Sequence, residues 1–158
     1  MLRIEPATEG DAALILRFIR GLAAYENLLD ACVATEEALH RTLFGERPAA
    51  EVLLAFWNNE PAGFALYFSS YSTFLAKPGI YLEDLFVEPE VRGHGIGTAL
   101  LARLARVAVE RNCGRLEWSV LDWNEPSIGF YRSLGAVAMD EWTGYRLTDA
   151  ALERLAER

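Results

Sequence analysis

The chain has 158 residues, a length typical of one domain, and 52% of them are hydrophobic, enough for a sizeable core. Its formal net charge of −8 argues against a nucleic-acid partner, which would require a basic patch, and mildly favours a cationic one. The two cysteines, Cys32 and Cys113, are too few for a disulfide framework and form no metal pair with His40 or His94. Because no apolar run reaches transmembrane length and no signal peptide is recognisable, we expect a cytoplasmic protein without a metal or a membrane partner.

Two helices are predicted after a short first strand, "LRIEPAT". Thr8, with Asp11 three residues later, is typical of a helix start and resembles an acidic capping box. The helix itself is indicated by apolar residues at helical spacing, namely Leu14, Ile15, Phe18, Ile19 and Leu22. A second, shorter helix is predicted from Thr35 to about Gly45.

The middle of the chain favours strands. "EVLLAFW" and "GFALYFSS" flank the turn-rich "NNEPAG", and "GIYLEDLFVE" follows as a further strand. A helix from about Gly97 to Asn112 leads to the strand "RLEWSVLDW". "NEPSIGFYRSLG" is typical of a compact helix capped by Asn124, "VAMDEWTGYRLT" of a last strand, and "DAALERLAER" of a closing helix. This order predicts a single α/β domain over residues 1–158, with one mixed, mostly antiparallel sheet and helices on its faces.

The stretch "VRGHGIGTALL" places glycines where a strand gives way to a helix. The first N–H groups of a helix have no intrahelical partners, and the helix dipole adds partial positive charge there. Glycine leaves the backbone open, so this loop can wrap a phosphate or pyrophosphate, and Arg92 can add a charge-assisted contact. A glycine-rich turn that serves only chain reversal remains the alternative.

Two known phosphate loops do not match this stretch. A Walker loop ends in Gly-Lys-Ser/Thr, but Gly97 is followed by Thr98 and Ala99. A Rossmann fingerprint needs Gly-x-Gly-x-x-Gly/Ala, and the last position is Thr98 when counted from Gly93 and Leu100 when counted from Gly95.

The pattern Arg92-x-x-Gly95-x-Gly97 after "LEDLFVEPEV" resembles the acyl-coenzyme A loop of the GNAT acetyltransferase superfamily. "YLED", "WNEPSIGFY", "LAAYEN" and "FGERP" extend the resemblance to its diamine branch, which contains the spermidine/spermine acetyltransferases and their thialysine-acetylating relatives. The resemblance covers nearly the whole chain, from "IEPAT" to about Arg146. It implies a sheet splayed between two parallel strands, the acyl-CoA N-acyltransferase fold.

The resemblance also implies how acetyl-CoA binds as co-substrate. The pyrophosphate would lie on the loop residues, which are Arg92, Gly93, His94, Gly95, Ile96, Gly97 and Thr98. The pantetheine arm and the acetyl group would hydrogen-bond to the backbone of three strand residues, Leu85, Phe86 and Val87. Further contacts would come from Asn124, Glu125, Pro126 and Ser127.

Two catalytic residues are implied in the same way. Tyr131 matches a tyrosine that acts as general acid on the departing thiolate, although a tyrosine that shares a helix face with Ile128 and Leu134 is often part of the core. Glu83 matches the residue that binds the amine and its proton, although acids at a solvated strand edge are common. Other substrate contacts match Tyr25, Glu26, Glu117, Trp118 and Ser119.

One departure concerns the acceptor. Where the polyamine enzymes have a glutamate before "GWR", this chain has Thr143 before "GYR", so one anionic contact for a long cationic substrate is missing. We therefore expect acetyl transfer to a primary amine of a small cationic acceptor, whether a polyamine, a diamine or a thialysine-like amino acid, by direct attack in a ternary complex. The alternatives are a non-catalytic acyl-CoA-binding module and an acetyltransferase for protein lysine or N-terminal amines. The resemblance further implies a homodimer.

Overall fold

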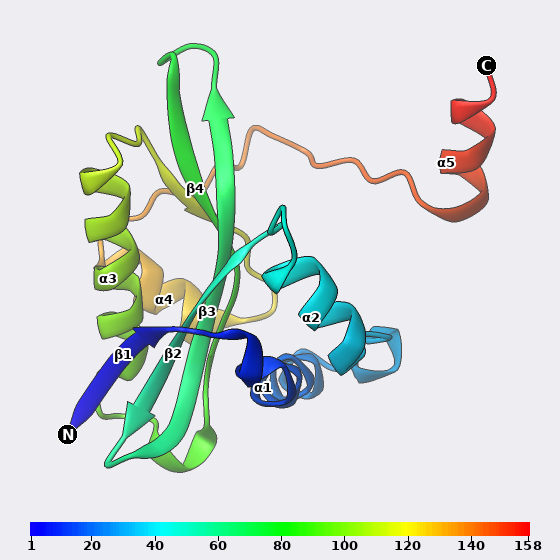
Figure 1. Cartoon of the computed structure of the whole chain (residues 1–158). Coiled ribbons are helices and arrows are strands. Elements are labelled where there is room, and N and C mark those ends of the chain that lie inside the picture. The colour runs from blue at the N-terminus through cyan, green and yellow to red at the C-terminus, as the bar shows by residue number, and fades with distance from the viewer. The chain divides into compact units, whose positions relative to one another are not determined.

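The computed structural model describes residues 1–158, which form two compact units, Met1–Leu121 and Asp122–Arg158. The first unit is built on a sheet whose strands lie in chain order (Figure 1). These are β1 (Leu2–Pro6), β2 (Glu51–Trp57), β3 (Glu60–Ser72), β4 (Lys77–Val87) and β5 (Leu116–Trp118). The first four strands pair antiparallel and β4 pairs parallel with β5, so the predicted mixed, mostly antiparallel sheet is confirmed.

The parallel pairing of β4 with β5 is short. It runs only from Ile80 opposite Leu116 to Leu82 opposite Trp118, because β5 is three residues long rather than the predicted "RLEWSVLDW". Residues 84–87 of β4 pair with β3 on one edge and with no strand on the other. Beyond Leu82, this edge of β4 therefore has backbone groups that no strand uses.

Helices cover both faces of this sheet (Figure 1). α1 (Ala12–Tyr25) and α2 (Glu36–Phe44) lie on one face, and α3 (Ile96–Glu110) lies on the other. Single 3₁₀ turns at Glu9–Asp11, Leu29–Ala31 and Pro89–Val91 join the elements. We refer below to the α1 face and the α3 face of the sheet.

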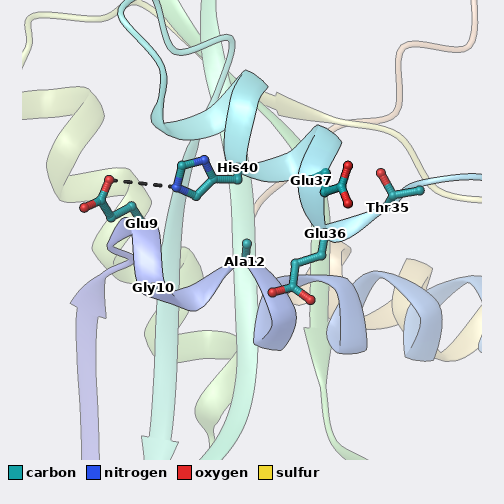
Figure 2. A pocket seen from close by; sticks show the side chains of 7 residues that line it. All are labelled: Glu9, Gly10, Ala12, Thr35, Glu36, Glu37 and His40. Carbon is teal, nitrogen blue, oxygen red and sulfur yellow. Dashed lines mark ion pairs between the residues drawn. The ribbon is translucent and has the colours of Figure 1, made fainter.

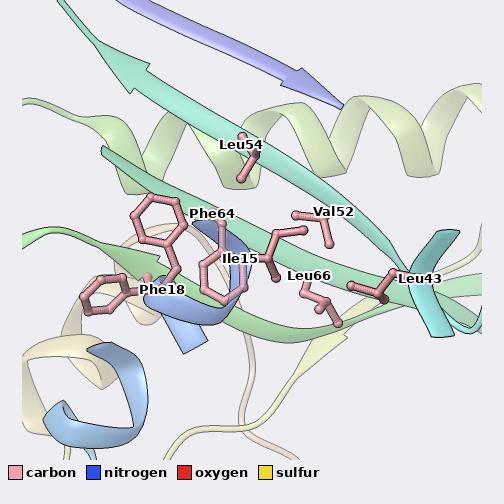
Figure 3. Close-up of a cluster of buried hydrophobic side chains, with 8 residues drawn as sticks. Ile15, Phe18, Leu43, Val52, Leu54, Phe64 and Leu66 are labelled. Atoms are coloured by element: carbon pink, nitrogen blue, oxygen red, sulfur yellow. The ribbon is translucent and has the colours of Figure 1, made fainter. Parts of the chain in front are cut away.

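The core on the α1 face joins the two helices to three strands (Figure 3). Phe18 of α1 stacks on Phe64 of β3, with ring centroids 5.6 Å apart, and lies 6.2 Å from the ring of Phe86 on β4. Phe18 and Phe64 are fully buried. The predicted apolar stripe of the first helix therefore faces the sheet, and aromatic contacts fix α1 against β4.

Local sequence signals explain where the first two helices begin. The backbone N–H of Thr8 donates to Asp11 Oδ2 at 2.7 Å, which confirms the capping box, although it opens a 3₁₀ turn directly before α1. Thr35 caps α2, since its Oγ1 accepts from the Ala38 N–H at 3.1 Å. Asn58 and Asn59, with φ of 50° and 68°, make the two-residue turn between β2 and β3.

The second unit contains α4 (Glu125–Ser133) and α5 (Asp149–Ala156). The predicted last strand in "VAMDEWTGYRLT" is wrong, because residues 137–148 form no strand. A strand needs a neighbour whose N–H and C=O groups complete its ladder, and no segment of this chain pairs with it. None of the helices combines the length and the apolar composition needed to cross a bilayer.

Candidate functional site

A β-bulge in β4 decides which face of the sheet receives its acidic residues. Cross-strand partners share a face, and Asp84 pairs with Leu66 whereas Leu82 pairs with Tyr67. Leu66 belongs to the core on the α1 face, and its neighbour Tyr67 therefore points to the α3 face. Glu83 is the extra residue that absorbs the shift in register. Leu82 and Asp84 therefore lie on opposite faces although they are two residues apart, and the bulge turns Asp84 toward the α1 face.

Three carboxylates gather where α1 ends beside this bulge. Burial, followed by the negative charges of Glu83 and Glu26, raises the pKa of Asp84 from 3.8 to about 6. Burial, followed by the charge of Glu83, raises the pKa of Glu26, the residue that caps the C-terminus of α1. Like charges in a partly desolvated site disfavour ionisation, so the cluster would be stabilised by a cation. A primary ammonium group, which is compact and carries three hydrogen-bond donors, meets that requirement.

Asp84 was not among the residues predicted from the sequence. The visible signal was its position next to Glu83 in an apolar strand. An unbroken strand places one of two adjacent acids away from the site, and nothing in the local sequence marks the bulge that prevents this.

The predicted glycine loop enters α3 with an open backbone. Gly93 and Gly95 have φ of +87° and +76°, in the left-handed region that favours glycine. The first backbone hydrogen bond at the helix start is from the Ala99 N–H to the Gly95 C=O at 3.0 Å, and no side chain caps the helix. The N–H groups of residues 96–98 are therefore left for another acceptor. A pyrophosphate fits these donors and the positive end of the helix dipole.

Arg92 links this loop to α1. Its Nε–H donates to the Val87 C=O at 2.9 Å, and its guanidinium lies 5.4 Å from the ring of Tyr25 and 5.7 Å from the ring of Phe86. Tyr25 precedes Glu26 in the chain. The residues predicted for the cofactor and those predicted for the acceptor therefore adjoin at the C-terminal end of α1.

The predicted residues on β5 divide between the two faces of the sheet. Glu117 pairs with Tyr81, and Trp118 pairs with Leu82, which points to the α3 face. Tyr81 and Glu117 therefore lie on the α1 face, where the Tyr81 hydroxyl hydrogen-bonds to that of Ser119 at 2.6 Å. The structure thus brings Glu117 and Ser119 to the face that carries Asp84, and places Trp118 on the other.

The remaining predicted residues belong to the second unit. Asn124 is buried and caps α4, its Oδ1 accepting from the Ser127 N–H at 3.4 Å. Glu125 and Pro126 form the first turn of this helix. Tyr131 is half-buried on α4 with its ring centroid 5.6 Å from that of Phe130.

A separate hollow of about 610 Å³ lies between the start of α1 and α2 (Figure 2). Its lining includes Glu9 and His40, which form an ion pair at 3.8 Å if the imidazole is protonated, together with Glu36 and Glu37. None of the predicted site residues lines it. The chain has no group of three or more His, Cys, Asp or Glu side chains arranged to hold a metal ion.

Comparison with known proteins agrees with this geometry. Residues 22–136 match the acetyltransferase (GNAT) family. A thialysine N-epsilon-acetyltransferase of Bos taurus is 41% identical over 164 residues, covering 97% of this chain and 96% of the bovine protein. An L-ornithine N5-acetyltransferase of Arabidopsis thaliana is 33% identical, covering 97% of this chain and 87% of the plant protein.

Solved structures share the fold. An integron cassette protein from the mobile metagenome of V. cholerae superposes with a TM-score of 0.83 at 30% identity, covering 99% of this chain and 98% of that protein. An aminoglycoside acetyltransferase from a soil metagenome superposes with a TM-score of 0.77 at 22% identity, covering 93% and 95% of the two chains. By its sequence match and its fold, the chain belongs to the acetyltransferase (GNAT) family and is an amine N-acetyltransferase.

Proposed function

We propose that this enzyme transfers the acetyl group of acetyl-CoA to a primary amine of a small cationic acceptor, by direct attack in a ternary complex. The observation that carries the proposal is the carboxylate cluster of Glu26, Glu83 and Asp84. It adjoins the glycine loop through the contact of Arg92 with Tyr25. A cation site beside an anion site suits an ammonium acceptor and a diphosphate-bearing acyl donor.

The acceptor must lose a proton before it can react. A free alkyl amine has a pKa of about 10.4, so only about one molecule in a thousand is neutral at pH 7. Glu83 would bind the ammonium and take its proton, directly or through water. Asp84 would hold the cation beside it, because a carboxyl group with a pKa of about 6 is ionised above that pH.

The transfer itself forms one bond and breaks another. The amine nitrogen would attack the thioester carbonyl carbon, the C–N bond would form, and the C–S bond would break to release coenzyme A. Tyr131 would donate its hydroxyl proton to the departing sulfur. Because a thiol has a pKa of about 8.5 and tyrosine one of about 10, this transfer is uphill by about 1.5 pKa units. It would be completed when the proton lost by the acetylated nitrogen restores the phenol of Tyr131, directly or through water.

The donor is assigned to residues on both units. In the first unit, the pyrophosphate would bind the loop of residues 92–98, whose N–H groups at residues 96–98 are open, and the pantetheine arm would use the edge of residues 85–87 that no strand occupies. In the second unit, residues 124–127 at the start of α4 would contribute further contacts. Members of the GNAT family use acetyl-CoA, which supports this assignment.

The acceptor is a polyamine, a diamine or a thialysine-like amino acid, and we favour the diamine and the amino acid over the longer polyamine. The relatives named for thialysine and ornithine support this preference. Thr143 supplies no charge for the far end of a long polyamine. Glu117, on the α1 face, offers an alternative anionic contact.

We also propose that the enzyme forms a homodimer and acts in the cytoplasm. Val137, Met139, Trp142 and Tyr145 are between 63% and 96% exposed in a segment without strand partners. Exposed apolar side chains at this density are typical of an interface, and a second copy of the chain could cover them. Both cysteines are free thiols, consistent with a reducing compartment.

The direct experiment measures free thiol released from acetyl-CoA by the purified enzyme. The acceptor panel would contain thialysine, ornithine, lysine, short diamines, spermidine, spermine and a lysine peptide. We expect the highest kcat/KM with a short diamine or an amino acid that carries a side-chain amine. Preference for the peptide, or for spermine over every shorter amine, would contradict the proposed acceptor class.

A further inference from the structure

An aromatic stack ties the glycine loop to a distant part of the sheet. The imidazole of His94 lies on the indole of Trp57, with ring centroids 4.7 Å apart and an angle of 18° between the planes. Trp57 ends β2, so 37 positions of the chain separate the two residues. His94 stands between the left-handed Gly93 and Gly95, at the apex of the loop.

The loop has few other contacts that could hold it. A Cβ atom added at Gly93 or Gly95 would meet nothing within 4 Å, so no other group packs against these two glycines in the direction of a side chain. The loop is fixed at one end by the hydrogen bond from Arg92 to Val87 and at the other by the buried side chain of Ile96. Between these two ends, the stack on Trp57 is the contact that restrains the apex.

The backbone around Trp57 is held in place by hydrogen bonds. The turn that follows it is held to β1, because the Asn58 N–H donates to the Met1 C=O at 2.9 Å and Arg3 donates to Asn59 Oδ1 at 3.0 Å. Trp57 itself pairs with Leu2 across the β1–β2 ladder. The indole of Trp57 can restrain the loop, because the backbone of this residue is paired with β1 on one side and with β3 on the other.

We infer that Trp57 is a positioning residue for acetyl-CoA, acting through His94. The stack holds the apex of the loop in the conformation that leaves the N–H groups of residues 96–98 open to the diphosphate. Without it, glycines on both sides of His94 would let the apex sample other conformations, and binding would have to order the loop. This inference rests on the proposed function, in which acetyl-CoA occupies this loop.

The test compares Trp57→Leu, His94→Leu and the double variant by calorimetric titration with acetyl-CoA. We expect each single change to weaken binding about 2- to 10-fold, the range typical of one aromatic pair. The double variant should bind no more weakly than the weaker single variant, because both changes remove one contact. Trp57→Phe keeps an aromatic ring and should recover most of the affinity. The KM for the amine should stay unchanged in all variants.

A measurement without ligand separates this inference from the proposed function. Amide hydrogen exchange of residues 92–98 should become faster in Trp57→Leu than in the unmodified protein, with circular dichroism unchanged. Tyr71→Leu, which removes an exposed aromatic ring elsewhere, is the matched control and should change neither exchange nor affinity. Unchanged loop exchange and unchanged affinity in Trp57→Leu would overturn the inference. If the unmodified protein does not bind acetyl-CoA, the proposed function fails, and the exchange comparison still supports or overturns the restraint by Trp57.

Discussion

Replacing Asp84 by asparagine should stabilise the protein while impairing catalysis. The pKa of Asp84 is 3.8 ordinarily and about 6 in the folded chain, so the folded state binds more protons than the unfolded state between these values. The contribution of Asp84 to stability is therefore most favourable below pH 4 and is lost as the pH rises through 6. This difference in pKa corresponds to about 3 kcal/mol lost above pH 6. Asp84→Asn removes the charge that causes the loss, and should raise the free energy of unfolding at pH 8 by up to that amount.

Urea unfolding followed by circular dichroism at pH 4, 6 and 8 measures this effect. The gain of Asp84→Asn should be near zero at pH 4 and largest at pH 8, with a Tm higher by roughly 6–12 °C. Glu110→Gln, an exposed change on α3, is the control and should show no such pH dependence. In the same variant the KM for the amine should rise, since the ammonium loses an anionic contact. Equal or lower stability of Asp84→Asn at pH 8 would refute the burial argument.

Three further changes test other parts of the molecule. Tyr131→Phe should lower kcat by about 10²- to 10⁴-fold with acetyl-CoA saturating, and near-normal turnover would exclude the general-acid role. Gly95→Ala forces a side chain into a left-handed conformation at φ +76°, which should cost about 1–2 kcal/mol in urea unfolding and weaken acetyl-CoA binding in calorimetry. Phe64→Ala empties a fully buried position and should lower the free energy of unfolding by about 3–5 kcal/mol; a loss below 1 kcal/mol would contradict the packing described.

Much of the fold could be predicted because its signals are local. Thr8 with Asp11, and Thr35 before its helix, mark helix starts through hydrogen bonds that span three residues. The two glycines before α3 mark a left-handed backbone that other residues rarely adopt. These interactions lie within one turn of the chain, so the residues that make them are adjacent in the sequence and can be read there.

Other features depend on which segments meet, and the sequence alone did not determine them. The bulge at Glu83 and the orientation of Asp84 follow from the register of β4 against β3. The contact between His94 and Trp57 follows from the place of β2 beside the loop. Residues 137–148 have the composition of a strand and lack a partner in the chain. The amino-acid sequence by itself determined the helices, the glycine loop and the residue types of the site. Only the tertiary structure decided which carboxylates share a face, because a shift of one residue in strand register reverses every side chain beyond it.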